Sequence, residues 1–569
     1  MLEIQRRLEK AIPGCPKTKM ATAGQFFHRL EEEAKGKKIP VWSGELYLEY
    51  HRATYTSMAK NKRLNRYSEF LLQNLEMLGI YSGEYPAEVL KQAWEVVLRN
   101  QFHDILPGSS IEEVYRDSWI EYGKMLPEVE KAMEAAFGKV AERYQIPKGS
   151  LVIYNFNGTE ESGLVALGEE QWNQLLPAVK QGVSQLCDDG AVRIAVSGIP
   201  AKGFVNITER NSDETVENMV QFSEECVENS FYRLKLNKQG QFASFYDKRV
   251  NREILKEGMC GNVLMTFEDK PFQFDNWNLE HYYTEKFWEV TELTQKEITE
   301  TGPLRYSIRL TYQYLDSVIV ETLRFYPDSS RIDLDFAIDW KEDQLFLKLL
   351  FPLELNTNEA SFDIQYGNVT RSTARNTSWD CARFEVCCQK WMDVSEEGYG
   401  VSFLNDCKYG VSVEENVVGI SLIKCGTYPN PKADRGRHVF SIAMYPHLWR
   451  WQEADTVREA YRFNNPLRGV VSAAETSGEK PEVLPVIQTD ASNVIVETVK
   501  RAEDGGSLIL RLYECKNRYT NVSCKLHPKI QKAWECNMLE EDKEELPVKE
   551  NGFRFVMKPY EIKTLRLYV

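Results

Sequence analysis

His103 and Asp104 are adjacent residues whose types could do chemistry together. A neutral imidazole can bind zinc, and a neighbouring carboxylate can accept hydrogen bonds from ligand hydroxyls or orient a metal ligand. The pair lies where a predicted helix meets the break Pro107-Gly108, an edge at which side chains can leave the core and face a cleft. A structural interpretation is also open, and from spacing alone it is the more common case. In that interpretation His103 caps the helix C-terminus and Asp104 starts the turn.

The rest of the sequence shows no complete catalytic constellation. It has seven histidines without a His-x-His, a His-x-x-x-His or a Cys/His cluster, so spacing predicts no complete metal site. There is no Gly-x-Ser-x-Gly elbow, phosphate-binding glycine loop or dinucleotide fingerprint. We expect His438 and His447 to be hydrogen-bonded residues of a β region rather than ligands.

The composition excludes several classes of partner. The net charge is −15, which disfavours nucleic acid and anionic membrane surfaces because both require basic patches. No run of about 20 apolar residues could span a membrane. Twelve cysteines lack a disulfide framework spacing, and the charged N-terminus does not resemble a signal peptide. We therefore expect a cytoplasmic protein with reduced thiols.

The elements that position His103 are predicted to be helices. Apolar residues at Leu64, Tyr67, Leu71, Leu75 and Leu78 predict one helix over residues 62–80. A second helix is expected from Pro86 toward Phe102, and a third from a capping box of Ser110 and Glu113 toward Tyr144. Short connections between them predict a small three-helix bundle.

After residue 150 the period changes from helical to alternating. Residues 331–340 alternate apolar and polar side chains, as a half-buried strand does, and similar runs recur to the C-terminus. The fold class is therefore multidomain α+β, with the bundle followed by large antiparallel β-sandwich domains. We expect part of a domain at residues 1–40, followed by the bundle at 41–146 and a small β domain at 147–221. A large sandwich is expected at 222–485, and a C-terminal sandwich at 486–569.

Several long motifs carry a family resemblance. They include Gly44-Glu-Leu-Tyr-Leu-Glu49, Lys62-Arg-Leu-Asn-Arg66, Gln101-Phe-His-Asp-Ile-Leu-Pro-Gly-Ser109, Asn405-Asp-Cys-Lys-Tyr-Gly410 and Thr427-Tyr-Pro-Asn-Pro431. In this order they resemble glycoside hydrolase family 38, in its cytosolic-type α-mannosidase branch, over essentially the whole chain.

The resemblance implies a retaining, zinc-dependent hydrolase of α-mannosides in oligosaccharides or N-glycan fragments. It implies that His103 is a zinc ligand, although other divalent metals are compatible, and that Asp104 contacts mannose hydroxyls. The segment Phe274-Asp-Asn-Trp-Asn278 departs from the family pattern at Phe274 and Asn278. Asp275 and Trp277 are candidate substrate contacts there, and a structural turn with a packed tryptophan is the alternative.

The family's catalytic domain precedes the bundle and supplies a His-x-His-x-Asp motif and an aspartate nucleophile, neither of which is found here. Residues 1–40 resemble only the end of that domain. We therefore expect no catalytic nucleophile in this sequence and no activity of the chain alone. A truncated product, or completion by a separate N-terminal polypeptide, would account for this pattern.

Three other interpretations stay open. The chain could be a non-catalytic carbohydrate-binding or scaffolding protein, the C-terminal subunit of a split enzyme, or a hydrolase of a mannosyl-glycerate-type compound. Members of the family are often oligomers, so a homo-oligomer is compatible with the resemblance.

Overall fold

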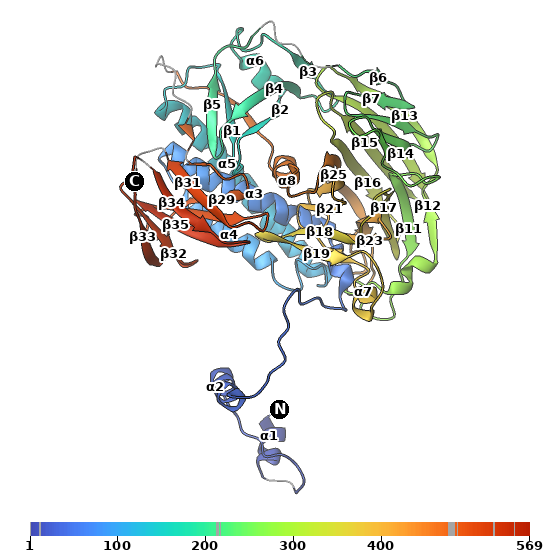
Figure 1. Cartoon of the computed structure of the whole chain (residues 1–569), viewed down its shortest axis with the longest axis vertical. Helices are drawn as coiled ribbons and strands as arrows, with labels where there is room; N and C mark the ends of the chain where they lie inside the picture. Colours follow the sequence, from blue (N-terminus) through green and yellow to red (C-terminus); the bar gives the residue numbers. More distant parts are fainter. Residues whose placement is uncertain are drawn as a thin grey trace. The chain divides into compact units, whose positions relative to one another are not determined.

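The computed structural model describes residues 2–10, 13–211, 216, 218–475, 484–485, 487–526, 530–550 and 552–568. It divides the chain into two compact units, residues 1–47 and 48–569. The first unit contains α1 (Leu2–Glu9) and α2 (Ala23–Ala34) (Figure 1). Neither helix buries a residue. Thr22 and Gln25 form a capping box at the start of α2, which satisfies backbone donors of its first turn.

The second unit begins with the predicted three-helix bundle. After η1 (Arg52–Tyr55) come α3 (Ala59–Ser82), α4 (Ala87–Asn100) and α5 (Glu112–Arg143). Leu71, Leu75 and Leu78 of α3 are buried, as their helical spacing predicted. They share one continuous core with Val494 and Leu510, so the bundle and the C-terminal sandwich pack against each other.

The predicted capping box at the start of α5 is wrong. The helix begins at Glu112, and Ile111 occupies the cap position without a side-chain hydrogen bond. The Ser110 hydroxyl instead donates to the carbonyl oxygen of Asp104 at 2.8 Å. Ser110 therefore fastens the preceding loop rather than the helix.

The large sandwich is built from antiparallel sheets, as the alternating runs predicted (Figure 1). The nine-stranded sheet contains, in spatial order, β13 (Leu293–Thr301), β14 (Tyr306–Tyr314), β15 (Ser317–Phe325), β16 (Ile332–Trp340), β25 (Gly436–Leu448), β22 (Tyr399–Asn405), β21 (Trp391–Ser395), β18 (Glu359–Ile364) and β19 (Gly367–Ser372). The six-stranded sheet contains β12 (Phe287–Glu289), β11 (Val263–Glu268), β17 (Leu345–Pro352), β24 (Val417–Lys424), β23 (Gly410–Glu414) and β20 (Val386–Cys387). The rings of Phe351 and Phe403 meet between these two sheets with centroids 4.9 Å apart.

Shorter elements complete the large sandwich. A five-stranded sheet consists of β10 (Arg252–Glu253), β9 (Phe242–Asp247), β8 (Tyr232–Leu236), β7 (Cys226–Glu228) and β6 (Gln221–Phe222). The connections carry η2 (His281–Glu285), α7 (Ser378–Ala382) and α8 (Thr456–Asn464).

The small β domain uses strands from two distant parts of the sequence. One sheet contains β26 (Arg468–Val471), β1 (Leu151–Asn155), β5 (Gly203–Ile207) and β27 (Leu484–Pro485), and the other contains β2 (Glu161–Leu167), β4 (Val192–Ile199) and β3 (Ser184–Leu186), with α6 (Glu169–Gln174) beside them. Strand β26 lies within the range expected for the large sandwich, but it pairs with β1, Val471 opposite Leu151. The chain thus returns to this domain after completing the sandwich.

The C-terminal sandwich has two sheets. One contains β28 (Ile487–Thr489), β31 (Thr520–Leu526) and β34 (Gly552–Met557), and the other β29 (Val494–Arg501), β30 (Leu508–Glu514), β35 (Ile562–Tyr568), β32 (Lys532–Cys536) and β33 (Asp542–Leu546). Strand β29 carries Val494, which belongs to the core shared with α3.

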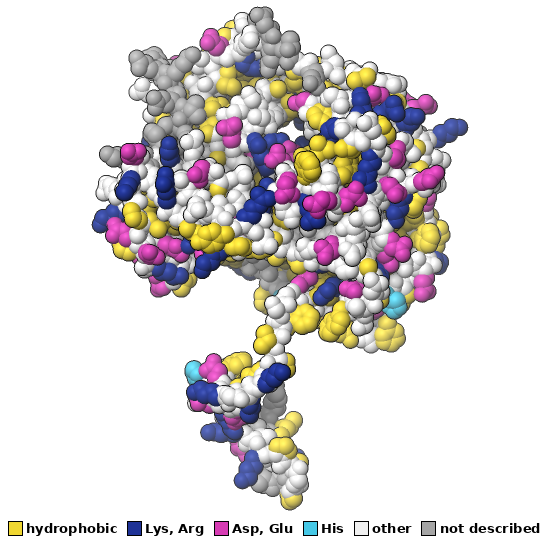
Figure 2. Space-filling model, viewed as in Figure 1, with side chains coloured by type: hydrophobic (Ala, Val, Ile, Leu, Met, Phe, Trp, Pro, Cys, Tyr) yellow, Lys and Arg dark blue, Asp and Glu magenta, His cyan; other side chains and the backbone are white. Residues whose placement is uncertain are grey.

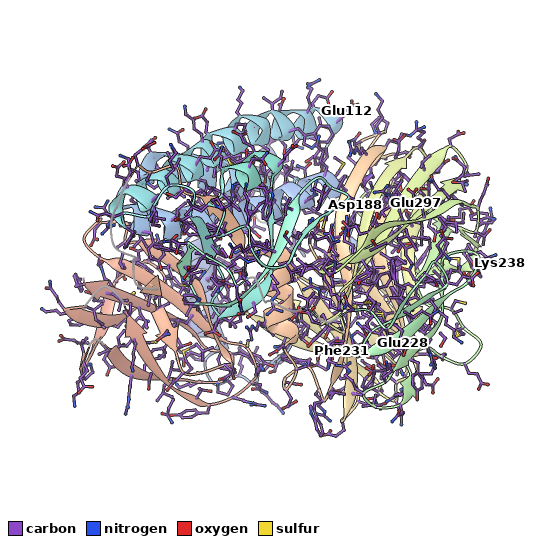
Figure 3. The ribbon with its side chains drawn as sticks, turned by 90° about the horizontal axis from the view of Figure 1, so that it is seen from above. Glu112, Asp188, Glu228, Phe231, Lys238 and Glu297 are labelled. Carbon is purple, nitrogen blue, oxygen red and sulfur yellow. The ribbon has the colours of Figure 1, made fainter. Side chains whose placement is uncertain are left out.

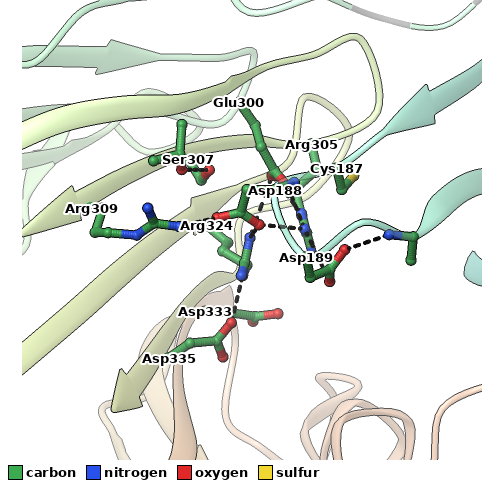
Figure 4. A network of polar contacts seen from close by, with 12 residues as sticks. Cys187, Asp188, Asp189, Glu300, Arg305, Ser307, Arg309, Arg324, Asp333 and Asp335 are labelled. Atoms are coloured by element: carbon green, nitrogen blue, oxygen red, sulfur yellow. Dashed lines mark hydrogen bonds and ion pairs between the residues drawn. The ribbon is translucent and has the colours of Figure 1, made fainter. Parts of the chain in front are cut away.

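A polar network joins the small β domain to the large sandwich (Figure 4). The backbone N–H of Asp188 donates to Glu300 at 2.8 Å, and the Asp188 carboxylate accepts from Arg309 at 2.9 Å. Arg309 also reaches Glu297 at 3.3 Å, and Figure 3 shows Asp188 and Glu297 close together. Arg305 binds Glu300 through two hydrogen bonds of 2.7 and 2.6 Å. The bidentate pair of Arg305 and Glu300 lies within the large sandwich and orients the Glu300 carboxylate. The contacts of Asp188 with Glu300 and Arg309 join the two domains.

Glu321 of β15 gives the large sandwich a testable pH dependence. Its side chain is fully buried and accepts one hydrogen bond, from Asn262 at 2.9 Å. Burial raises the pKa of Glu321 from 4.5 to about 8, because the charged form loses its hydration, and the bond from Asn262 opposes this only in part. The folded protein therefore holds a proton at neutral pH that the unfolded chain releases. Stability from this group is fully present below pH 4.5 and is lost as the pH rises toward 8.

We expect Glu321→Gln to remove this dependence, because the amide has a similar shape and does not titrate. Between pH 5 and pH 8 the wild-type free energy of unfolding should fall relative to the variant by about 1.4 kcal/mol per pH unit at most. Urea unfolding of both proteins across this range measures the difference. Parallel pH profiles for the two proteins would contradict the assignment.

Candidate active-site loop around His103

The loop between α4 and α5 presents His103 to solvent. Its side chain is 77% exposed, and the imidazole ring packs on Phe102 with centroids 4.2 Å apart. The imidazole Nε2 lies 3.4 Å from Oδ2 of Asp104, whose side chain is 42% exposed. The two residues thus form an exposed imidazole–carboxylate pair, the arrangement expected of a metal ligand with an adjacent polar contact.

Asp104 also organises the loop, as the structural interpretation expected. Its carboxylate Oδ1 accepts from the Ser109 hydroxyl at 2.9 Å. Its carbonyl oxygen accepts from the hydroxyls of Ser110 at 2.8 Å and Tyr115 at 3.2 Å. Since these contacts use Oδ1 and the carbonyl, both interpretations of Asp104 are compatible: it fixes the turn while Oδ2 stays beside His103.

Gly108 brings the base of this loop against Ser57, which lies two residues before the start of α3. It has φ +97°, and a Cβ atom there would lie 2.5 Å from the carbonyl oxygen of Ser57. The close approach requires glycine, because any other residue meets both backbone strain and a steric clash. Ser57 is itself fully buried.

We expect Gly108→Ala to destabilise the protein by about 1–3 kcal/mol. The control is Gly123→Ala on α5, where no atom lies within 4 Å of the added Cβ atom. That change should be neutral or stabilise the helix by up to about 1 kcal/mol, because alanine loses less backbone entropy than glycine. Urea unfolding of both variants tests the opposite signs, and equal shifts would contradict the close approach.

The second predicted segment meets the loop through the same serine. The Ser57 hydroxyl donates to the carbonyl oxygen of Asn276 at 2.9 Å, so residues 274–278 and residues 101–110 both contact Ser57. The backbone of Ala53 in η1 also donates to the carbonyl oxygen of Trp277 at 3.0 Å. The structure therefore brings the two predicted segments to one place.

Asp275 is engaged inside this segment. It is 7% exposed, and its Oδ2 accepts from the backbone N–H of Thr427 at 2.6 Å and from the Thr427 hydroxyl at 3.0 Å. Lys424 donates to the Asp275 carbonyl oxygen at 2.7 Å. These contacts show that Asp275 holds the turn. A contact between Asp275 and a sugar stays a prediction.

Trp277 lies in an aromatic cluster. Its ring is 5.9 Å from that of Phe274 and 6.4 Å from that of Tyr428, and Phe274 and Tyr428 are 51% and 59% exposed. Aromatic rings of this kind offer an apolar face with a large contact area, on which a sugar ring can stack. Tyr428 was not singled out from the sequence, although it lies in the motif of residues 427–431; nothing in its local pattern separates an exposed ring from a core one.

Two other histidines of the second unit, His438 and His447, have hydrogen-bond partners of their own. His438 is buried with its ring 2.6 Å from the Asp434 carbonyl oxygen, and His447 is buried 2.7 Å from Asp393, as predicted for hydrogen-bonded residues. Within the described residues no group of three or more His, Cys, Asp and Glu side chains could hold a metal ion. His103 fits one zinc position, but three or four ligands are required, so the described residues do not make a complete site.

Charged side chains of both signs are interspersed over the face shown in Figure 2. No helix in the described ranges is both long and apolar enough to cross a membrane.

Comparison with known families accounts for the three main regions of the second unit. The Alpha mannosidase middle domain matches residues 49–140, which contain the bundle and His103. The Glycosyl hydrolases family 38 C-terminal domain matches residues 227–432, and the Glycosyl hydrolases family 38 C-terminal beta sandwich domain matches residues 493–565. Together the three matches cover well over half of the sequence, in chain order. The chain belongs to glycosyl hydrolase family 38.

Curated relatives are similar to this chain over nearly its whole length. Alpha-mannosidase G of Dictyostelium discoideum is 31% identical over 98% of this chain and 55% of its own length. Alpha-mannosidase 2C1 of Homo sapiens is 30% identical over 100% of this chain and 54% of its own length. The chain thus spans about half the length of these curated relatives. The crystal structure of an alpha-mannosidase from Enterococcus faecalis V583 has the same fold, with a TM-score of 0.80 at 15% identity, over 99% of this chain and 74% of that one.

Proposed function

We propose that this chain supplies the bundle and sandwich part of a zinc-dependent α-mannosidase that acts with retention. The observation that carries the proposal is the exposed imidazole of His103 beside the Asp104 carboxylate, on a loop whose base is fixed against Ser57. That loop lies inside the region matched by the Alpha mannosidase middle domain. The names of the two relatives support the substrate class, α-mannosides.

In this proposal each residue has a distinct task. His103 is one zinc ligand, Asp104 accepts hydrogen bonds from mannose hydroxyls through Oδ2, and Trp277 supports the sugar with its ring. Asp275 holds the segment of Trp277 through Thr427 and Lys424. Zinc, when bound, would polarise and orient the oxygen atoms of the sugar.

The proposal requires groups beyond the described residues. A tight zinc site needs at least two more ligands than His103, and retention needs a nucleophilic carboxylate about 5–5.5 Å from an acid/base carboxylate. We infer that the remaining ligands and the nucleophile come from outside the described residues, which hold no metal cluster, and that the described residues do not hydrolyse mannosides by themselves. A cytoplasmic location is consistent with the twelve free cysteines.

Hydrolysis of an aryl α-mannoside tests the proposal in two samples. One is the chain with added zinc, and the other is the chain with a polypeptide that spans the part of Alpha-mannosidase G that this chain does not match. We expect turnover in the second sample, loss of turnover on chelation, recovery on adding zinc, and an α-configured first product by NMR. Equal turnover in the first sample would contradict the need for outside groups, and turnover in neither would contradict the function.

A second candidate, a non-catalytic carbohydrate-binding protein, is favoured by the exposed rings of Phe274 and Tyr428. Such a protein would bind α-mannosides equally well with and without zinc. Titration calorimetry in the presence of a chelator separates the two, since the first candidate requires the metal at His103.

A further inference from the structure

Lys62, on the first turns of α3, lies directly beneath the His103 loop. It is 4% exposed, and its Nζ lies 2.5 Å from the Ser57 carbonyl oxygen, 2.9 Å from that of Leu106 and 3.2 Å from that of Pro107. An ammonium group has three N–H donors, so each carbonyl can receive one. The cation is therefore fully used by backbone acceptors from two segments, residue 57 and residues 106–107.

The burial of this cation is costly. Burial lowers the pKa of Lys62 to about 7, and the nearby carboxylate of Asp434 opposes this only in part. That carboxylate makes its own hydrogen bonds, accepting from the backbone N–H groups of Met58 at 2.7 Å and Ala59 at 2.8 Å. The Lys62 ammonium thus donates to the loop, at Leu106 and Pro107, and to Ser57 beside it.

The loop needs these donors. The carbonyls of Leu106 and Pro107 follow the end of α4 and precede α5, so they have no place in a helical hydrogen-bond ladder. These carbonyls are partly buried, and a partly buried carbonyl that loses its partner destabilises the backbone around it. His103 is therefore held from both sides: through Asp104 by Ser109, Ser110 and Tyr115, and through residues 106–107 by Lys62.

We propose that Lys62 is a positioning residue that sets where His103 and Asp104 stand relative to Ser57, and thereby relative to the Trp277 segment that Ser57 also contacts. The consequence for catalysis rests on the function proposed above. The effect of Lys62 on how well the loop is ordered does not depend on that function.

The chain offers a matched control in Lys202. This lysine is 5% exposed, and its Nζ also donates to carbonyl oxygens, those of Phe156 at 2.7 Å and Glu497 at 2.9 Å. Burial lowers its pKa to about 8. Its contacts lie in the small β domain and the C-terminal sandwich, so its loss should cost stability without reaching the His103 loop.

Amide hydrogen exchange on the full chain tests the loop directly. The reporters are the backbone N–H groups of Ile105, Gly108 and Ser109, each hydrogen-bonded within the loop. We expect Lys62→Met to accelerate their exchange by about tenfold or more, because the loop loses two charge-assisted hydrogen bonds and the third, to Ser57, is lost with them. Lys202→Met should leave these three amides at the wild-type rate. Lys62→Gln retains amide donors, so its exchange rates should lie between those of the wild type and of Lys62→Met. If Lys62→Met does not fold, the exchange rates of Lys62→Gln are compared with those of Lys202→Gln instead.

A second arm uses the assembly that hydrolyses an aryl α-mannoside. There Lys62→Met should lower kcat/KM by about 10- to 100-fold, as expected for a displaced active-site group, and Lys202→Met should not. Unchanged loop exchange in the Lys62 variants, or equal acceleration in the Lys202 variants, would overturn the positioning role. Faster loop exchange with unaltered kcat/KM would overturn its link to catalysis. If the proposed function is wrong, zinc-dependent turnover will be absent, while the faster loop exchange in the Lys62 variants will still be observed.

Discussion

His103→Ala is expected to lower kcat/KM for an aryl α-mannoside by about 100-fold or more at fixed zinc. Loss of a residue that merely orients a metal ligand costs about 10- to 100-fold, so loss of a ligand should cost at least the upper end of that range. The free energy of unfolding should change by no more than about 0.5 kcal/mol, because the side chain is 77% exposed. Activity is measured on the assembly with the added polypeptide, and urea unfolding on the chain alone from the same preparation.

The matched control for this variant is His281→Ala in η2. His281 is another exposed histidine of the second unit, and its ring contacts Tyr282 rather than the His103 loop. Its removal should leave both activity and zinc affinity at the wild-type level. If His103→Ala keeps its activity, His103 is not a zinc ligand; if it loses stability instead, His103 serves as a structural cap of α4.

Lys424→Met is expected to destabilise the protein by about 3–5 kcal/mol. The Lys424 side chain is fully buried, with Nζ 2.5 Å from Oδ2 of Asp269, which is also buried, and 2.7 Å from the Asp275 carbonyl oxygen. Burial raises the pKa of Asp269, and Lys424 opposes that rise. Removing the cation leaves a buried carboxylate without its counter-charge, which is the costly half of breaking a buried pair.

A double-mutant cycle separates the pair from its surroundings. Asp269→Asn combined with Lys424→Met should be less destabilised than the sum of the single variants, by about 1–3 kcal/mol, because no uncompensated charge remains. Lys270→Met is the control: Lys270 pairs with Glu268 at 3.0 Å but is 59% exposed, and the change should stay within about 0.5 kcal/mol. Additive effects in the cycle would contradict a direct interaction.

The bundle could be predicted because its signal is local. The spacing of Leu71, Leu75 and Leu78 identifies the buried face of α3 without any knowledge of its partners. The start of that helix could not be predicted in the same way. Met58 has φ +57°, and the N–H groups of Met58 and Ala59 are capped by Asp434, a carboxylate from a distant part of the chain.

The site was predictable to the same extent. The motif around His103 and Asp104 rests on contiguous residues, and it identified a loop whose histidine the structure shows exposed and whose base lies beside Ser57. The roles of His103 and Asp104 in binding stay predictions. Lys62, Ser57 and Tyr428 were not singled out from the sequence, because their positions beside these segments depend on contacts with distant parts of the chain. Lysine is normally an exposed residue, so nothing in the sequence marks Lys62 as buried.

The return of the chain to the small β domain has a consequence during protein synthesis. Strand β1 leaves the ribosome long before its partner β26, since Leu151 pairs with Val471. At 5–20 residues per second the interval is roughly 15 to 60 s. During this interval the edge of β1 that will pair with β26 has no partner strand, although β5 can already pair with the opposite edge of β1. We expect the nascent chain to present this edge to chaperones until the large sandwich has been made, and a ribosome-stalled chain ending near residue 460 to be the form most prone to aggregate.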